Sequence, residues 1–209
     1  MTPTVRRAAE RACFGLAFVC LGTFAAGKGQ AWLFEHRERA RLTAAAGEGL
    51  PVIGSPSPAV SPRLLRHSAL PGRAWGRIEI PRLGVDALVA EGVDAATLRV
   101  AVGHVPDTAF PDEVGNVALA GHRDTVFRPL RELQPGDVVT VTTPLGVFSY
   151  EVEQIRIVAP HETEVIAPVP ERVLTLVTCY PFGYVGPAPQ RYVVRARFAQ
   201  PLPASQPAL

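Results

Sequence analysis

The stretch Leu174-Thr175-Leu176-Val177-Thr178-Cys179-Tyr180 is the most informative part of this 209-residue chain. Its leucine, valine and threonine residues predict a strand. This strand ends on Cys179, the only cysteine outside the amino-terminal segment. A histidine ends a second apolar run, Asn116-Val117-Ala118-Leu119-Ala120-Gly121-His122, and Arg191 opens a third. We therefore expect the fold to bring together a cysteine, a histidine and an arginine.

These three residue types suit nucleophilic acyl transfer. A thiolate is the attacking form of cysteine, and a neighbouring cation lowers the thiol pKa. Acyl transfer also needs a proton donor for the leaving amine and fixed donors for the developing oxyanion. His122 and Arg191 are candidates for these two roles. The alternative is that Cys179 is an inert cysteine that closes a strand.

The motifs around these residues resemble those of the sortases, cysteine transpeptidases that cleave a sorting motif near the end of secreted proteins. Thr-Leu-x-Thr-Cys ends at Cys179, Arg191 follows twelve residues later, and Ala-Gly-His-Arg-Asp-Thr lies about sixty residues upstream. The segments Gly121 to Leu130 and Cys179 to Arg191 resemble the class D type. The similarity extends from Trp75 to Phe198.

The resemblance implies roles for particular residues. Cys179 is the expected nucleophile, His122 the general acid/base, and Arg191 the residue that holds the substrate backbone and the oxyanion. The implied reaction cleaves a Leu-Pro-x-Thr-Gly-like motif, forms a thioacyl-enzyme on Cys179 and transfers the acyl group to an amine acceptor of the cell envelope. Two alternatives remain: a hydrolytic cysteine protease that uses the same residues, and a non-catalytic β-barrel adaptor.

A loop rich in proline and glycine separates Cys179 from Arg191, and by resemblance it forms one wall of the substrate groove. Its aromatic residues either bury substrate side chains or pack only within the loop. The predicted substrate-binding residues are Thr178, Tyr180, Phe182 and Tyr184.

Two further residues are expected to support the site without contacting substrate. His104, in Gly103-His104-Val105-Pro106, either orients the site or bonds a loop backbone. Asp124 follows His122 closely and either orients its ring or caps a local turn.

We expect no metal or organic cofactor. The chain contains no His-Glu-x-x-His, no Cys-x-x-Cys and no glycine-rich phosphate loop. Calcium is an alternative because four acidic residues occur in two predicted loops, although their spacing is unspecific. These residues are Asp112, Glu113, Glu162 and Glu164.

The amino-terminal region carries an export or anchoring signal. Arg6, Arg7 and Arg11 precede a run from Ala12 to Ala26 that has no charged side chain. Residues 1–34 are therefore predicted to form a cytoplasmic tip and a hydrophobic, single-pass helix in a bacterial cell membrane, with the catalytic domain on the extracytoplasmic side. The alternative is a cleaved signal peptide, because the run is shorter than a typical spanning helix.

The rest of the chain divides by composition. Residues 35–72 are predicted to form a charged stalk and a proline-rich linker, residues 73–200 the catalytic domain, and residues 201–209 a disordered tail. Within the domain, seven or eight short strands and one or two short helices predict a mostly β fold. Many short strands favour a closed barrel, and the resemblance implies the eight-stranded sortase barrel.

Charge limits the expected partners. The net charge is only +2, and basic residues form no stripe with interleaved aromatics, so nucleic acid is not an expected partner. The expected partners are secreted proteins with a carboxyl-terminal sorting motif, an amine acceptor of the envelope, and the membrane.

Overall fold

The computed structural model describes residues 3–47 and 69–199. By its internal contacts the chain divides into Met1–Arg37 and Glu38–Leu209. Most of the predicted linker and the whole predicted tail lie outside the described residues.

Helix α1 spans Pro3–Gly47, and its many alanine, arginine and leucine residues favour helix. It includes both the uncharged run and the charged segment that follows. None of the helices in residues 3–47 and 69–199 combines the length and the apolar character that a membrane crossing needs. The predicted hydrophobic, spanning helix is therefore not supported by this structure.

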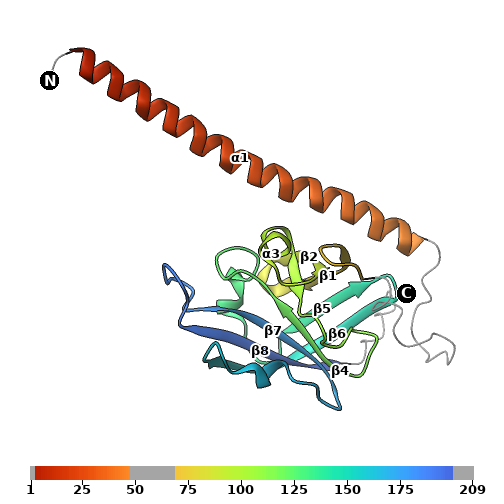
Figure 1. The fold of residues 1–209 in the computed structure, drawn as a ribbon. Helices are drawn as coiled ribbons and strands as arrows, with labels where there is room; N and C mark the ends of the chain where they lie inside the picture. The colour runs from red at the N-terminus through yellow and green to blue at the C-terminus, as the bar shows by residue number, and fades with distance from the viewer. Residues whose placement is uncertain (1–2, 48–68, 200–209) are drawn as a thin grey trace, which may run out of the picture. The chain divides into compact units, whose positions relative to one another are not determined.

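The remaining elements form a closed eight-stranded barrel with the strand order β1-β2-β3-β4-β7-β8-β6-β5 (Figure 1). The strands are β1 (Ala74–Ile80), β2 (Val85–Glu91), β3 (Val102–His104), β4 (Gly115–Ala120), β5 (Val138–Thr143), β6 (Gly146–Val158), β7 (Arg172–Tyr180) and β8 (Gln190–Ala199). The prediction of a mostly β, eight-stranded barrel is confirmed.

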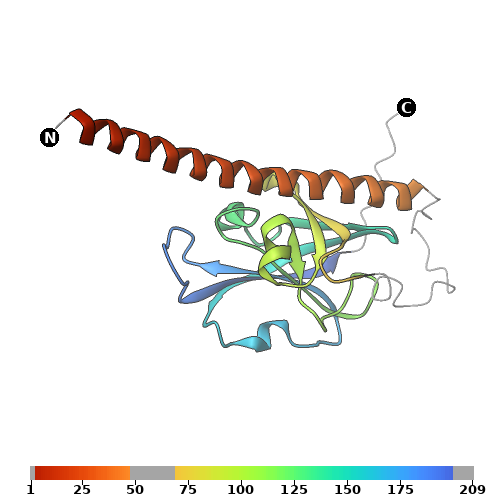
Figure 2. The ribbon, with the colours of Figure 1, turned by 45° about the horizontal axis from the view of Figure 1, so that its top comes forward.

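Short helical segments occupy the connections between the strands. They are η1 (Pro81–Leu83), α3 (Ala95–Val100), η2 (Arg128–Glu132) and η3 (Thr163–Ile166). Asp94 caps α3: its carboxylate accepts hydrogen bonds from the backbone amides of Ala96 and Thr97. The Thr97 hydroxyl also bonds this carboxylate and holds the pKa of Asp94 below its ordinary value. In Figure 2, η3 is seen in the long connection between β6 and β7.

Successive side chains of each strand point alternately into the barrel and to its outer face. The inward positions of β4, β7 and β8 are fully or almost fully buried aliphatic residues. They include Val117, Leu119, Leu174, Leu176, Val194 and Ala196. The alternate positions, with Cys179 and Arg191 among them, therefore lie on the outer face.

The strand directions determine which ends meet. Strands β4 and β7 pair in parallel, with Ala120 opposite Val177 in the register. Their carboxyl ends consequently lie at the same edge of the barrel. Residues that follow β4 are thus brought close to Cys179 near the end of β7.

Candidate active site

Cys179 and Arg191 are direct cross-strand partners. In the antiparallel pair of β7 and β8, the Cα of Cys179 lies opposite the Cα of Arg191. Directly opposed residues project from the same face of a sheet. Cys179 is a free thiol, and both residues are partly exposed. The structure therefore brings these two predicted site residues together.

His122 lies immediately beyond a double attachment between its own turn and β7. The amide of Gly121 donates to Val177 O at 3.2 Å, and Thr178 Oγ1 donates to Gly121 O at 2.7 Å. The peptide groups on both sides of Gly121 are thus fixed to the two residues that precede Cys179. His122 is exposed, and its ring makes no hydrogen bond within residues 3–47 and 69–199.

Gly121 is required by close packing. A Cβ at this position would lie 2.7–2.9 Å from ring carbons of Phe127, which is fully buried. The amide of Phe127 in turn donates to His122 O at 3.1 Å and closes a tight turn. The sequence Gly-His therefore fits a turn that leaves the strand and presents the imidazole to solvent.

The Arg191 guanidinium is partly engaged. Its Nη1 donates to the carbonyl oxygens of Ala188 at 3.2 Å and Gln190 at 3.0 Å. Its Nε and Nη2 have no partner among the residues that the structure describes. These two nitrogens are therefore available to bond a substrate carbonyl or an oxyanion.

Two aromatic residues of the β7–β8 loop pack against the barrel. Tyr180 and Phe182 both contact the ring of Tyr192, with centroid distances of 6.2 and 5.1 Å, and both pack on the core cluster. Burial raises the pKa of Tyr192. Of the two predicted roles, packing is the one observed for Tyr180 and Phe182. Tyr184 is 46% exposed and is the aromatic residue of this loop that projects to solvent.

Arg123 ties the histidine turn to the β7–β8 loop, a role the sequence did not reveal. Its Nη2 donates to Tyr184 O at 2.7 Å and to Gly186 O at 3.1 Å, and its guanidinium lies 5.9 Å from the Tyr184 ring centroid. An arginine next to His122 and a loop rich in proline and glycine, with unpaired carbonyls, are the signals that point to such a bond.

Substrate binding by Thr178 stays a prediction, and the structure shows a contact of its side chain within the protein. The side chain is 2% exposed and its hydroxyl is used by Gly121 O. Because it alternates with Cys179, it points into the barrel. Thr178 therefore holds the histidine turn in place.

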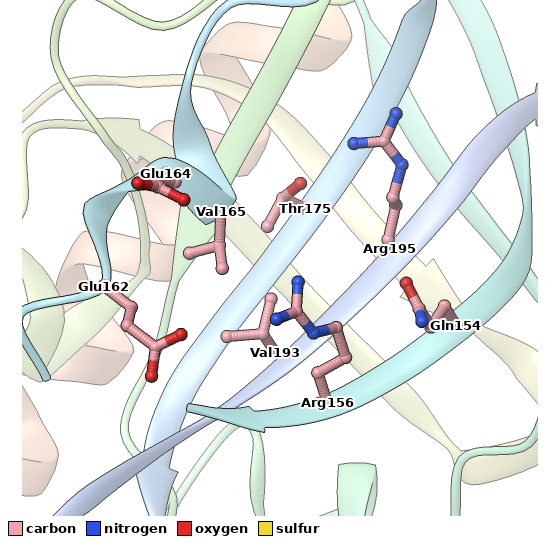
Figure 3. A pocket seen from close by; sticks show the side chains of 8 residues that line it. All are labelled: Gln154, Arg156, Glu162, Glu164, Val165, Thr175, Val193 and Arg195. Atoms are coloured by element: carbon pink, nitrogen blue, oxygen red, sulfur yellow. The ribbon is translucent and has the colours of Figure 1, made fainter. Parts of the chain in front are cut away.

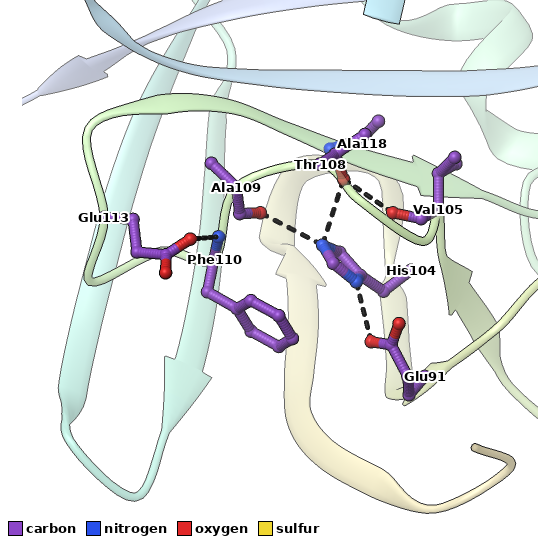
Figure 4. Close-up of polar contacts among 8 residues, drawn as sticks. All are labelled: Glu91, His104, Val105, Thr108, Ala109, Phe110, Glu113 and Ala118. Carbon is purple, nitrogen blue, oxygen red and sulfur yellow. Dashed lines mark hydrogen bonds and ion pairs between the residues drawn. The ribbon is translucent and has the colours of Figure 1, made fainter. Parts of the chain in front are cut away.

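His104 is fully buried, and both of its ring nitrogens are engaged (Figure 4). Nδ1 lies 2.7 Å from Glu91 Oε2, and Nε2 lies 3.0 Å from Ala109 O and 3.1 Å from Thr108 Oγ1. Its ring also packs on Trp75 and Phe110. Of its two predicted roles, bonding a loop backbone is the one observed.

The remaining acidic candidates show no catalytic or metal-binding arrangement. Asp124 is exposed, and its carboxylate has no hydrogen bond in the described part of the chain. Glu113 and Glu162 each accept a bond from a backbone amide of their own loop. No three His, Cys, Asp or Glu side chains gather as a metal site among residues 3–47 and 69–199.

A pocket lies beside this site on the outer face of β6, β7 and β8, under the connection that carries η3 (Figure 3). Its lining residues are Gln154, Arg156, Glu162, Glu164, Val165, Thr175, Val193 and Arg195. The connection is fastened over β7 by Asn116, which donates to Val165 O and Ala167 O and accepts a bond from Thr175.

The chain is similar to known proteins in sequence. Residues 78–199 match the model of the sortase domain family. The chain is 44% identical over 124 residues to sortase D of Bacillus subtilis; the match covers 59% of this chain and 63% of that protein, so the chain spans less than two thirds of this curated relative.

Solved structures of sortases have a similar fold. A sortase D5 transpeptidase of Clostridium perfringens superposes with a TM-score of 0.64 at 28% identity, covering 80% of this chain and 99% of that one. A sortase C of the same organism, solved with the carboxyl-terminal cell wall sorting motif, gives a TM-score of 0.57 at 27% identity and covers 63% of this chain and 73% of that one. The family match, the barrel and the facing cysteine and arginine lead to one conclusion: the chain belongs to the sortase family, with a class D-like sequence.

Proposed function

We propose that this protein is a cysteine transpeptidase that cleaves a peptide bond in a sorting motif and transfers the acyl part to an amine. The observation that carries the proposal is the direct pairing of Cys179 with Arg191, beside a histidine turn bonded to the same strand.

In the first half-reaction, the thiolate of Cys179 attacks the scissile carbonyl carbon. A carbon–sulfur bond forms and the carbonyl electrons move to oxygen. The free Nε and Nη2 donors of Arg191 stabilise that oxyanion. The carbon–nitrogen bond then breaks, and His122 gives its proton to the leaving amine.

In the second half-reaction, an incoming amine attacks the thioester. His122 takes the proton that the amine loses, and the thiolate of Cys179 leaves as the new amide bond forms. The exposed position of His122, with no competing hydrogen bond among the described residues, supports both transfers.

The proposed substrate is a secreted protein that carries a Leu-Pro-x-Thr-Gly-like sequence near its carboxyl terminus. The resemblance to class D sortases supports this substrate class. The related sortase C that was solved with a cell wall sorting motif supports it as well. The proposed acceptor is an amine of the cell envelope.

We propose further that the enzyme works outside the cytoplasm and is delivered there by its amino-terminal segment. The support is Arg6, Arg7 and Arg11 before an uncharged run. Membrane fractionation of the producing cells, with the intact mass of the recovered protein, tests this. Full-length protein in the membrane fraction supports an anchor, a shortened soluble product supports a cleaved signal, and full-length protein in the cytoplasm contradicts export.

Intact-mass spectrometry of the full chain tests the reaction. The protein is mixed with Leu-Pro-x-Thr-Gly peptides, with and without an added amine, beside the Cys179→Ala variant. The expected result is an acyl adduct that requires Cys179 and moves to the amine. If the acyl adduct were hydrolysed by water as fast with abundant amine as without it, and no amine product formed, the protein would be a protease instead.

Absence of any adduct would contradict the proposal if the folded protein also left Cys179 unreactive towards iodoacetamide. An inert thiol of this kind is the property of a structural cysteine, as in a β-barrel adaptor. A reactive thiol without adduct would contradict the proposed motif and leave cysteine chemistry in place.

A further inference from the structure

Two arginine side chains hold the β7–β8 loop by its carbonyl groups. Arg123 Nη2 donates to the first two of these carbonyls, and Arg191 Nη1 donates to the other two. In chain order, the accepting residues are Tyr184, Gly186, Ala188 and Gln190. Every second carbonyl of residues 184–190 is therefore bonded to one arginine or the other.

The segment between the two attachments is stiff. Pro187 separates the part of the loop held by Arg123 from the part held by Arg191. Pro189 lies between the two carbonyls that accept from Arg191. Proline fixes its own φ and restricts the conformation of the residue before it. A displacement of the Gly186 carbonyl is consequently passed on to the carbonyls that hold Arg191.

Gly186 is the residue of this loop with the greatest conformational freedom. Its φ is 102°, in the region that glycine adopts readily and other residues avoid. The two bonds of Arg123 lie on either side of this angle, because the Tyr184 carbonyl precedes it and the Gly186 carbonyl follows it. Arg123 therefore fixes the loop at the point where its backbone turns most easily.

The same arginine restrains the histidine turn. His122 lies between Gly121, whose amide and carbonyl are bonded to β7, and Arg123, whose side chain is bonded to the loop. The chain is thus held on both sides of His122. The imidazole position and the loop position consequently depend on each other.

The bonding of Arg123 is incomplete in a way that favours a role in the reaction over a role in stability. Its Nη1 is buried and has no hydrogen-bond partner in the described part of the chain. A buried donor without a partner lowers stability. The carbonyls that Nη2 holds belong to the exposed residues Tyr184 and Gly186, and water can bond them equally well. Arg123 therefore contributes little to the free energy of unfolding.

We infer that Arg123 is a positioning residue for the proposed transpeptidation, on which this inference rests. Through Gly186 and Pro187 it sets the direction in which the free Nε and Nη2 of Arg191 meet the oxyanion. Through its own backbone it holds His122 beside the same loop. Arg123 acts by way of these two residues and is itself neither the proton donor nor the oxyanion donor.

Steady-state kinetics of the full chain with a Leu-Pro-x-Thr-Gly peptide and an added amine test the inference in Arg123→Gln. Because the oxyanion forms only in the transition state, we expect kcat and kcat/KM to fall together by about tenfold or more, with KM nearly unchanged. Arg123→Lys should recover part of this loss, since lysine keeps the charge and can bond one carbonyl. The melting temperature should change little in both variants.

Arg131→Gln is the matched control for these measurements. Arg131 lies in the same connection between β4 and β5, is 52% exposed and pairs with Glu132 at 3.1 Å. We expect its kcat and KM to equal those of the wild-type protein. A lower melting temperature with unchanged kcat in Arg123→Gln would assign Arg123 a purely structural role and overturn the inference.

The path through the loop has a test of its own. Pro187→Gly makes the segment between the two arginines flexible and should also lower kcat. If both residues act along one path, adding Arg123→Gln to Pro187→Gly should lower kcat by a smaller factor than in the wild-type protein. Fully additive losses would overturn the inferred path from Arg123 to Arg191.

Cleavage by chymotrypsin separates this inference from the proposed reaction. Tyr184 is 46% exposed, and fragment masses of the full chain report the rate of cutting after it. We expect cutting about fivefold faster in Arg123→Gln, as the loss of hydrogen bonds to the loop predicts, and no change in Arg131→Gln. Faster cutting supports the inference even if no acyl adduct ever forms. Equal cutting of Arg123→Gln and the wild-type protein overturns it even if transpeptidation is established.

Discussion

Two Gly-His sequences, Gly103-His104 and Gly121-His122, have opposite surroundings in the barrel. In both, the glycine lies where a Cβ would collide with its neighbours: 2.4 Å from Gly92 O at Gly103, and 2.7 Å from the Phe127 ring at Gly121. His104 is fully buried and hydrogen-bonded through both ring nitrogens. His122 is exposed, and its ring is free of hydrogen bonds to the described residues.

The comparison shows that both Gly-His sequences place a glycine in a closely packed position. The neighbouring strands and turns then decide whether the histidine ring is hydrogen-bonded inside the barrel or exposed to solvent. His104 lies within β3, opposite Glu91 of β2, so both of its nitrogens find partners inside the barrel. His122 lies beyond the end of β4, where the chain turns away from the sheet. An imidazole with free nitrogens can accept and release a proton during a reaction, whereas one that bonds two fixed partners stabilises the fold.

The largest effect is expected at His122. His122→Gln removes the proposed proton donor and should lower the rate of peptide cleavage at least about a hundredfold, with little change in the melting temperature. Peptide cleavage and thermal unfolding measure these two properties. The exposed His36 provides the control, since His36→Gln should change neither. Near-normal cleavage by His122→Gln would contradict the proposal that the exposed His122 is the proton donor.

His104→Gln should have the opposite effects of His122→Gln: a large loss of stability, and no direct loss of a catalytic group. The Ala109 carbonyl only accepts and the Thr108 hydroxyl donates to Val105 O, so Nε2 carries a hydrogen, while Nδ1 lies 2.7 Å from Glu91 Oε2 on the other side of the ring. Glutamine cannot satisfy both sides, and we expect the free energy of unfolding to fall by about 3 kcal/mol in urea titrations.

Glu91→Gln is the matched variant for this buried pair. Because its amide can donate to Nδ1, we expect a smaller loss of stability than for His104→Gln. If His104→Gln kept its stability and lost activity, the assignment of His104 to the fold would be wrong.

The two glycines test the feature that the sequences share. Gly103→Ala and Gly121→Ala should each lower the free energy of unfolding by about 1–3 kcal/mol, more for Gly103 because its Cβ would meet backbone. Gly121→Ala should also slow cleavage, since it displaces the His122 turn. Gly183→Ala is the control because nothing lies within 4 Å of its Cβ. Equal stability of all three variants would show that close packing does not explain the glycines.

The smallest effect is expected at the ion pair of Arg82 with Asp137, in which the arginine side chain is exposed. This pair gives a baseline for the buried pair of His104 and Glu91. Arg82 donates to both carboxylate oxygens of Asp137, and this hydrogen bonding lowers the pKa of Asp137. A lowered pKa in the folded state stabilises the protein above the carboxyl's ordinary pKa, and this stabilisation is lost as pH falls through the lowered value.

Asp137→Asn should therefore melt slightly below the wild-type protein near neutral pH, and the two melting temperatures should converge as the pH falls through the lowered pKa of Asp137. The loss should be smaller than that of His104→Gln because solvent screens the exposed Arg82 guanidinium. A loss that stays constant across this pH range would show that the Asp137 charge is not its cause.

Sequence patterns predicted much of the fold and the facing of Cys179 and Arg191 within it. The β-branched runs specified strands because alternating apolar residues need one buried face. Cys179, His122 and Arg191 were recognisable because each follows or opens such a run. The roles of Thr178 and Arg123 were not, since their partners, Gly121 and the loop carbonyls, are about 60 residues away in sequence.

The sequence by itself thus determined that the domain is a barrel of short strands and which residue types meet at one edge of it. Only the tertiary structure decided that one Gly-His histidine is buried and the other exposed, and that Arg156 and Arg195 share a pocket with Thr175. The physical reason is that strand periodicity is local and written into every few residues, whereas burial and pairing depend on which strands become neighbours when the sheet closes.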